Sequence, residues 1–319
     1  MISATGVKGS GSRLRRKAIP RSLCTCLFLA LFLQSPPGIS RAEERGDRVS
    51  LDGIALPVAR IVSLAPNITE TLASIGAADQ VVGYSVFCKM QVKFPPRPIA
   101  GSFNQPHLDA IRPLKPDLVL FSEHAKPEDL EKLKAAGLRY LVLPASTISD
   151  IVANVRLLGT LTGRIAKAGE VAGEIERVVG AAREHSKTID PGRRPRVFLE
   201  VDGPDPLYTA GGRSFISEMV ELAGGINVFA DRTESYPLIT PDAVIKADPE
   251  YIFVGGFNKS ADEIHNRPGW DRISAVKSGK VRTGVWDLWL LLWRPGPSVG
   301  VTIQKLAREL GTDPSASPK

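Results

Sequence analysis

The sequence predicts an α/β fold of two related, doubly wound lobes that one long α-helix joins, with a ligand cleft between the lobes. Three observations support this fold class: short apolar segments alternate with helical ones, one such pattern occurs twice in register, and a long helical segment separates the two copies. Short strands that alternate with helices are typical of parallel, doubly wound sheets.

The first half of the chain contains the alternation in its clearest form. A helix that follows Pro66 is expected to end at Gly76, and a second helix, over residues 130–136, is expected to end at Gly137. Glycine often ends a helix because it adopts the left-handed backbone conformation without strain. Strands are expected at residues 60–64, 81–84, 98–100, 118–121 and 140–143.

The second half repeats this plan. Residues 109–121 align without a gap on residues 242–254, and each copy begins with Asp-Ala, turns at a proline followed by an acidic residue, and ends in an apolar strand. The opening strands also correspond, at residues 60–64 and 196–200. A match in register is stronger evidence than shared periodicity, so we predict an N-terminal lobe over 59–147 and a C-terminal lobe over 191–311.

A helical segment lies between the two copies. Apolar residues recur at helical spacing over 148–187, and proline is absent from Ile148 to Ile189. We predict one linking helix over 148–190, with a bend near Gly159–Gly163 because each glycine weakens a helix by about 1 kcal/mol. A stiff helical hinge favours small rocking movements of the lobes over wide closure.

The N-terminus has the three parts of a secretory signal. Residues 1–22 contain six basic and no acidic residues, residues 23–33 are largely apolar, and Ser40-Arg41-Ala42 is a small-x-small triplet. Eleven apolar residues are too few to span a bilayer, which takes about 20. We predict a signal peptide over 1–42, cleavage near Ala42, export to the periplasm, an irregular segment over 43–58 and a disordered tail over 312–319.

The positive charge of the chain belongs to that signal. Seven of the 41 basic residues and none of the 34 acidic ones lie in residues 1–42, so the remainder is formally neutral. Charge therefore gives no reason to expect nucleic-acid or direct membrane binding. Cys88 is the one cysteine after residue 42, which excludes an intramolecular disulfide in the mature chain.

Four segments carry a resemblance to a known family. They are Arg60–Glu70, Leu114–Leu118, Glu221–Asn227 and Arg294–Pro297. In this order and spacing they resemble the helical-backbone periplasmic binding proteins of ABC importers, which serve the uptake of vitamin B12, ferric siderophores and haem. The likeness covers most of residues 59–310, and the cobalamin-binding branch is the most similar.

The resemblance implies a partner, the permease of an ABC importer, and a role for two carboxylates. In the family, one surface glutamate on each lobe pairs with arginines of the permease, and the matching positions here are Glu70 and Glu221. Each has a structural alternative. Asn67 and Glu70 are spaced as a helix N-cap and its third residue, and Glu221 has the position of an exposed residue near a helix end. The resemblance also implies a monomer.

The ligand is expected where both sheets present the carboxyl ends of their strands. Aromatic faces there suit a large planar ligand, because they bury much area with few rotamers to freeze. Trp293 is expected in a core strand instead. The predicted ligand-binding residues are Pro66, Asn67, Tyr84, Phe103, Tyr208, Tyr236, Phe257, Asp287 and Trp289.

The identity of the ligand stays open between a corrinoid, which we prefer, and a ferric siderophore or haem. The expected cleft loops are aromatic and acidic, with Arg213 and Arg232 as the nearest basic residues, whereas an anionic ferric chelate favours basic residues. Haem would need an axial ligand, for which Tyr84, Tyr236 or His124 is conceivable.

The remaining motif searches are negative. The four histidines lack metal-ligand spacing among themselves, and His124 alone, after a strand end, is a candidate axial ligand. Packing is expected for Cys88. The sequence lacks a nucleophile elbow, a zinc-protease motif and a phosphate loop. We therefore predict a binding protein without a cofactor of its own, with an exported enzyme or a signalling adaptor as alternatives.

Overall fold

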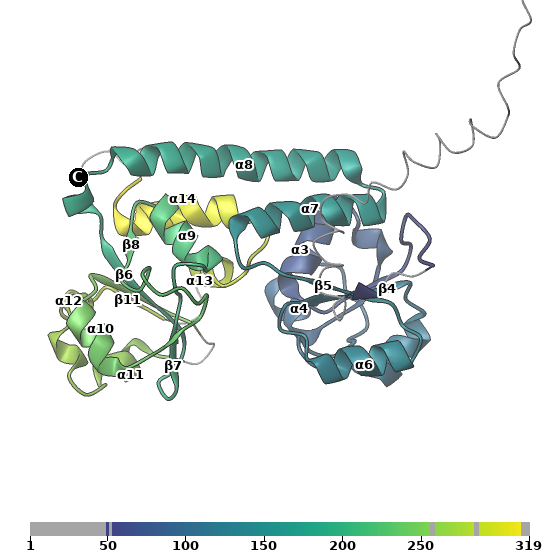
Figure 1. The fold of residues 1–319 in the computed structure, drawn as a ribbon, viewed down its shortest axis with the longest axis horizontal. Coiled ribbons are helices and arrows are strands. Elements are labelled where there is room, and N and C mark those ends of the chain that lie inside the picture. Colours follow the sequence, from purple (N-terminus) through teal and green to yellow (C-terminus); the bar gives the residue numbers. More distant parts are fainter. Residues whose placement is uncertain (1–48, 51–52, 256–258, 284–286, 314–319) are drawn as a thin grey trace, which may run out of the picture.

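The computed structural model describes residues 49–50, 53–255, 259–283 and 287–313. Two α/β lobes lie side by side, and the helix α8 (Ile165–Thr188) runs along one side of both (Figure 1). The predicted signal peptide over 1–42 and residues 314–319 of the predicted tail lie outside the described residues. In the described part of the chain, no helix combines the length and hydropathy needed to cross a membrane.

The N-terminal lobe is built on a five-stranded sheet in the order β1-β5-β4-β2-β3. The strands are β1 (Val49–Ser50), β2 (Ile61–Ser63), β3 (Val81–Tyr84), β4 (Leu118–Ser122) and β5 (Tyr140–Leu143). All pairings are parallel except that of β1 with β5. The helices are α3 (Pro66–Ser74), α4 (Val86–Gln91), α5 (Leu108–Ile111), α6 (Pro127–Ala135) and α7 (Ile148–Thr162), with short 3-10 turns η1 (Ala78–Gln80) and η2 (Arg112–Leu114).

Two expectations for this lobe are wrong in detail. The segment 43–58 was expected to be irregular, but its two-residue strand β1 pairs with β5, and a strand that short has no periodicity to detect. The strand expected at 98–100 is reduced to a single bridge between Ile99 and Tyr84. Two prolines beside it, at positions 96 and 98, lack the N–H that a longer ladder would need.

The C-terminal lobe has a mixed sheet in the order β11-β10-β6-β7-β9, with β8 also paired to β6. The strands are β6 (Arg196–Asp202), β7 (Leu207–Thr209), β8 (Ile226–Asn227), β9 (Leu238–Ile239), β10 (Tyr251–Val254) and β11 (Val281–Arg282). The pairings β6–β7 and β7–β9 are antiparallel, so the wholly parallel sheet expected here is wrong on that side. The short turn between β6 and β7 returns the chain without a crossover helix, which forces antiparallel pairing.

Helices surround the sheet of this half (Figure 1). They are α9 (Phe215–Leu222), α10 (Pro241–Ala247), α11 (Ala261–His265), α12 (Ser274–Lys277), α13 (Asp287–Leu292) and α14 (Val299–Leu310), with 3-10 turns η3 (Pro191–Arg193) and η4 (Trp270–Arg272). Beyond α14, Thr312 bonds the carbonyl of Ala223 and Asp313 pairs with Arg308. The expected disordered tail is therefore wrong for residues 312 and 313.

The internal repeat is present in the structure at the level of single hydrogen bonds. In the N-terminal lobe Asp117 Oδ2 accepts from the Arg60 N–H at 2.8 Å, and in the C-terminal lobe Glu250 Oε2 accepts from the Arg196 N–H at 2.9 Å. These are the acids of the two aligned proline–acid turns. Each fastens its turn to the start of the neighbouring strand, β2 in one lobe and β6 in the other, so the lobes are related in structure as well as in sequence.

The segment expected to form one helix over 148–190 is two helices instead. α7 ends at Gly163, which has the left-handed φ of 71°, and α8 begins two residues later. The helices pack against each other, with Arg156 and Glu176 2.8 Å apart across the pair. A Cβ added at Gly159 would lie 2.3 Å from that of Ala168, so the glycines that suggested a bend permit a close reversal. The 24-residue helix α8 alone spans the lobes.

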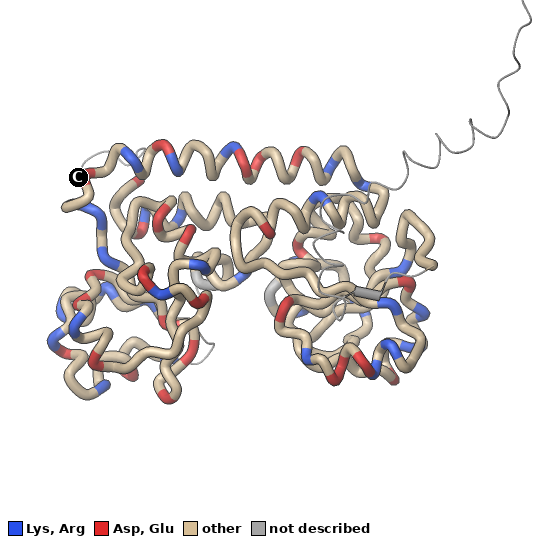
Figure 2. The backbone as a smooth tube through the Cα atoms, in the orientation of Figure 1, with Lys and Arg blue, Asp and Glu red and all other residues tan. Residues whose placement is uncertain are grey.

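One apolar core joins the two halves, and each lobe also has a core cluster of its own. One cluster of buried residues includes Leu72 of α3, Leu158 of α7, Ile175 of α8, Met219 of α9 and Ile303 of α14. Residues of both charges, Lys and Arg as well as Asp and Glu, occur along α8 and are mixed over both lobes (Figure 2). The apolar underside of α8 therefore holds both lobes, and its charged face is solvated.

Candidate functional site

A cleft lies between the lobes. Its larger part has a volume of about 490 Å³ and its smaller part about 240 Å³. Both parts are lined by Phe103, Glu123, His124, Trp293 and Pro295. Because they share these five residues, they form one continuous site with walls from both lobes. Its larger part falls within the usual range for small-molecule sites.

The N-terminal wall is formed by the end of β4 and a neighbouring loop. Glu123 follows the strand, and its Oε2 accepts from Ser146 Oγ at 3.0 Å. The Phe103 ring packs edge-on against His124 and against Phe87, with ring centroids 6.1 and 5.3 Å apart. This wall therefore combines aromatic surface with one carboxylate held in a defined direction.

The C-terminal wall is formed by β6, β7, α9 and the loop before β9. It contributes Val201, Asp202, Tyr208, Phe215, Ile216, Tyr236 and Gly255. Burial raises the pKa of the Tyr236 phenol, and the negative charge of Glu123 on the opposite wall raises it further. Tyr236 is therefore a neutral phenol at physiological pH and can donate a hydrogen bond into the cleft.

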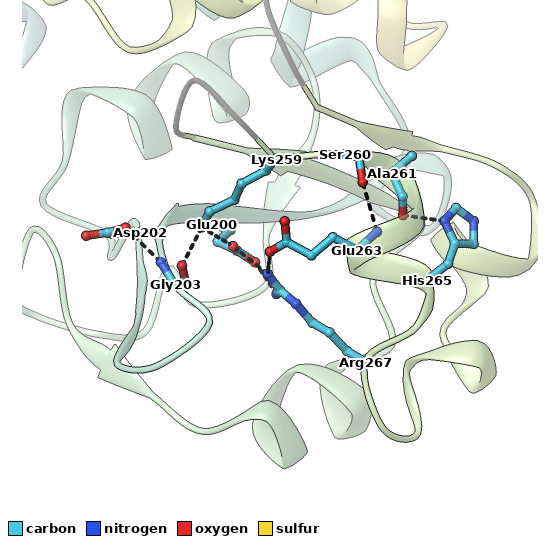
Figure 3. Close-up of polar contacts among 9 residues, drawn as sticks. All are labelled: Glu200, Asp202, Gly203, Lys259, Ser260, Ala261, Glu263, His265 and Arg267. Carbon is cyan, nitrogen blue, oxygen red and sulfur yellow. Dashed lines mark hydrogen bonds and ion pairs between the residues drawn. The ribbon is translucent and has the colours of Figure 1, made fainter.

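Figure 3 shows a buried charged cluster close in the chain to Asp202, one of the residues of this wall. Glu200 is fully buried and lies between Lys259, whose Nζ is 2.8 Å from Oε1, and Arg267, which contacts both carboxylate oxygens. Lys259 also donates to the Gly203 carbonyl at 2.7 Å. The cluster thus fastens the turn after Asp202, and none of its three ionic side chains lines the cleft.

The base of the cleft is the segment that follows α13. Trp293 and Pro295 line both parts of the cleft, and Arg294 lines the smaller one. Arg294 Nε lies 2.7 Å from Glu70 Oε2 on α3. The expectation that Trp293 belongs to a core strand is wrong about the strand, because Trp293 follows the helix α13. Trp293 is partly buried against the core, as expected, and it also lines the cleft.

The structure brings most of the predicted ligand-binding residues together. Pro66, Asn67, Phe103, Tyr208 and Tyr236 line the cleft, and so does the candidate axial ligand His124. Tyr84 does not line the cleft. It lies at the end of β3 with its side chain facing the core, where it is 2% exposed and packs edge-on against Phe94.

The other predicted residues lie outside what the structure describes. Phe257 falls in the undescribed segment 256–258, and the side chains of Asp287 and Trp289, at the start of α13, are likewise not described. Sequence reasoning missed Phe215, Ile216, Leu290 and Pro295. Apolar helix residues next to a cleft have the same spacing as core residues, so periodicity alone does not separate them.

The two glutamates expected to meet a permease differ in their surroundings. Glu221 is exposed near the end of α9. Glu70 is not a free surface residue, because its side chain is 15% exposed and paired with Arg294. The capping alternative for Glu70 is also wrong: α3 begins at Pro66, with Ala65 as an N-cap that makes no side-chain hydrogen bond.

The remaining candidate groups have structural partners. Cys88 is buried against the hydroxyls of Thr69 and Ser85, and burial raises the pKa of its thiol, as expected for a packing role. His185 bonds the Thr312 carbonyl and His265 that of Ala261. Within the described residues, no group of three or more His, Cys, Asp or Glu is arranged to hold a metal ion.

Comparison with known proteins identifies the family. The family model described as periplasmic binding protein matches residues 61–285. The chain belongs to the periplasmic binding protein family. An uncharacterised ABC transporter substrate-binding lipoprotein of Bacillus subtilis is 30% identical over 80% of both chains.

Other relatives have more specific names. A vitamin B12-binding protein of Pectobacterium carotovorum is 30% identical over 66% of this chain and 74% of its own length. A cobalamin-binding protein of Halobacterium salinarum is 32% identical over 64% of this chain and 55% of its own length. These names bear out the predicted class, a substrate-binding protein.

Solved structures of this periplasmic binding protein family share the fold. The haem-binding protein of Roseiflexus in its apo form has a TM-score of 0.68 at 25% identity, covering 79% of this chain and 98% of that one. The vitamin B12-binding protein of Vibrio cholerae has a TM-score of 0.66 at 23% identity, covering 80% and 97%. The predicted two-lobed fold is therefore confirmed.

Proposed function

We propose that this protein captures a corrinoid in the inter-lobe cleft and delivers it to the permease of an ABC importer. The observation that carries the choice of ligand is the charge of the cleft. Glu123 and Asp202 face it from the two lobes, and the one Arg among its described lining residues, Arg294, is paired with Glu70.

The chemistry of the three ligand classes differs at this point. Haem carries propionates, and many ferric siderophore complexes are anionic, so both would meet the negative charges of Glu123 and Asp202 in a partly desolvated site. A corrinoid carries neutral primary amides around its ring, and these donate hydrogen bonds that carboxylates accept. The aromatic faces of Phe103 and Tyr208 supply apolar area for the macrocycle.

Haem remains the second candidate because His124 is exposed in the cleft and lines both of its parts. Tyr236 is the weaker axial ligand, since ligation to ferric iron uses a tyrosinate and the raised pKa of Tyr236 opposes deprotonation. A haem-binding role would therefore depend on His124.

Titration of the purified mature protein separates these proposals. We expect cyanocobalamin to bind at micromolar concentration or tighter by calorimetry, and haem and an anionic ferric siderophore to bind more weakly. The double variant Glu123→Gln, Asp202→Asn should reduce the difference between the affinity for cyanocobalamin and the affinities for haem and the siderophore. Absence of cyanocobalamin binding together with tight haem binding that His124→Ala abolishes would replace the corrinoid assignment with haem.

Location and partner complete the proposal. Export would follow from the signal over 1–42, with cleavage near Ala42, and intact mass spectrometry of the periplasmic fraction tests it. Contact with the permease is proposed through the exposed Glu221. The protein would act as a monomer, since its cleft is complete within one chain.

A further inference from the structure

Glu70 and Arg294 form an ion pair between parts of the chain that lie far apart in sequence. Glu70 is on α3 of the N-terminal lobe, and Arg294 is in the segment between α13 and α14. Arg294 Nε is 2.7 Å from Glu70 Oε2, and the two side chains are 10% and 15% exposed. A pair this well shielded from water is screened far less than a surface pair.

The backbone around the pair is shaped to the carboxylate. A Cβ added at Gly296 would lie 2.5 Å from Glu70 Oε2, so only glycine leaves room for the carboxylate at this position. One turn earlier on α3, Asn67 Nδ2 donates to the Pro295 carbonyl at 3.3 Å. Helix α3 therefore holds the segment 294–296 at two points on one face.

The held segment carries the base of the cleft. Trp293 and Pro295, on either side of Arg294, line both parts of the cleft. After this segment the chain continues into α14, which packs against α8 and α9. The segment thus connects the C-terminal half to α3, and the ion pair is one of the two polar contacts that join it to this helix.

We propose that Glu70 is a positioning residue for ligand binding: through Arg294 it fixes Trp293 and Pro295 as the base of the cleft. Glu70 itself is not among the residues that line the cleft. A residue that served only to dock the protein on a permease would leave ligand affinity unchanged when replaced. The inference rests on the proposed function for its probe ligand, cyanocobalamin.

The test combines binding with a ligand-independent signal from Trp293. The variants are Glu70→Gln, Arg294→Gln and the double variant that combines them. Each is made in mature protein labelled with 5-fluorotryptophan for fluorine NMR. We expect Glu70→Gln to weaken cyanocobalamin binding by at least about tenfold in calorimetry, because the buried Arg294 guanidinium loses the negative charge of Glu70 beside it. The Trp293 resonance, assigned through Trp293→Phe, should shift, whereas that of the core residue Trp270 should not.

Two comparisons distinguish positioning from a general loss of structure. Glu176→Gln breaks an Arg–Glu pair of similar length that is half-exposed on α7 and α8, and it should leave affinity and the Trp293 resonance unchanged. If Glu70 acts through Arg294, the double variant should bind no more weakly than Arg294→Gln alone. If Glu70→Gln does not fold, Glu70→Asp replaces it, because aspartate keeps the charge but has a shorter side chain. Glu70→Asp should then show a smaller loss of cyanocobalamin affinity and a smaller shift of the Trp293 resonance.

The outcomes are separable from those of the ligand assignment. Wild-type affinity and an unshifted Trp293 resonance in Glu70→Gln would overturn the positioning role, and additive losses in the double variant would do the same. If the wild-type protein does not bind cyanocobalamin, the corrinoid proposal fails. The Trp293 resonance then still decides the positioning role, because it is recorded without ligand.

Discussion

Lys115 and Asp248 occupy equivalent positions in the two lobes and share a left-handed backbone, with φ of 44° and 40°. Among the residues that the structure describes, no other non-glycine residue has a positive φ. Arg60 donates to the Lys115 carbonyl, and Arg196 donates to the Asp248 carbonyl. The repeat seen in the sequence therefore extends to an unusual backbone conformation and to the arginine that holds it.

This shared conformation predicts opposite responses to the same substitution. Lys115→Gly should stabilise the protein by about 0.5–1 kcal/mol, since relief of left-handed strain exceeds the entropy cost of glycine. Asp248→Gly should destabilise it by about 1 kcal/mol, because the Asp248 carboxylate accepts from the Ser274 N–H at 2.7 Å and from its hydroxyl at 3.0 Å. Urea unfolding measures both, and a shift of the same sign would contradict this account.

Asp248 also predicts a pH dependence. The hydrogen bond from the Ser274 N–H lowers the pKa of Asp248 below its ordinary value in the folded state. A lowered folded pKa gives stability that is present above the unfolded pKa, about 3.9, and is lost as the pH falls toward the folded value. Below about pH 4 the wild type should therefore lose more stability than Asp248→Asn. Parallel melting curves in acid would refute this.

The buried cluster behind the cleft predicts a large effect on stability. Glu200→Gln leaves Lys259 and Arg267 without their shared carboxylate, and we expect a loss of about 3 kcal/mol in unfolding free energy. Adding Lys259→Met should recover part of that loss. As a control, Glu174→Gln breaks the exposed pair with Arg177 and should leave the unfolding free energy nearly unchanged, because water and salt screen an exposed pair. Equal effects of the two Glu→Gln variants would be inconsistent with a buried cluster.

Tyr236 and Glu123 give a prediction across the cleft. Since burial and Glu123 raise the pKa of Tyr236, its phenol should stay protonated at pH 10. The absorbance near 295 nm, where the phenolate absorbs, measures this. Glu123→Gln should lower the pKa of Tyr236 without returning it to the ordinary value, because burial is the larger cause. The variant Tyr236→Phe identifies the absorbance that belongs to Tyr236. An unchanged pKa of Tyr236 in Glu123→Gln would contradict the proposed effect of Glu123.

Glu221 tests the proposed contact with the permease. Glu221→Ala should leave cyanocobalamin affinity unchanged and reduce uptake through the cognate importer by at least about tenfold, because an exposed docking charge acts on association. Glu184→Ala changes an exposed glutamate on α8 and should leave uptake unchanged. Unimpaired uptake in Glu221→Ala would remove this residue from the docking surface.

Sequence by itself determined the class of fold, the relation of the two lobes and much of the cleft. These features depend on local spacing: strand length, proline–acid turns and the glycine stop at Gly76 act within a few residues of the chain. Phe103, His124, Tyr208 and Tyr236 were predicted for the same reason, since loops after strands meet at one edge of a sheet.

Tertiary structure alone decided which distant groups meet. Residues 148–190 read as one helix because helical spacing continues through Gly163, and only the packing of α7 on α8 selects the reversal there. The sequence pattern indicates a surface glutamate at position 70, whereas the fold brings Arg294 Nε to 2.7 Å from Glu70 Oε2. The local spacing of apolar residues indicates which side of a helix or strand is buried. Which distant residue a side chain contacts depends on the path of the whole chain, and local spacing contains no information about that path.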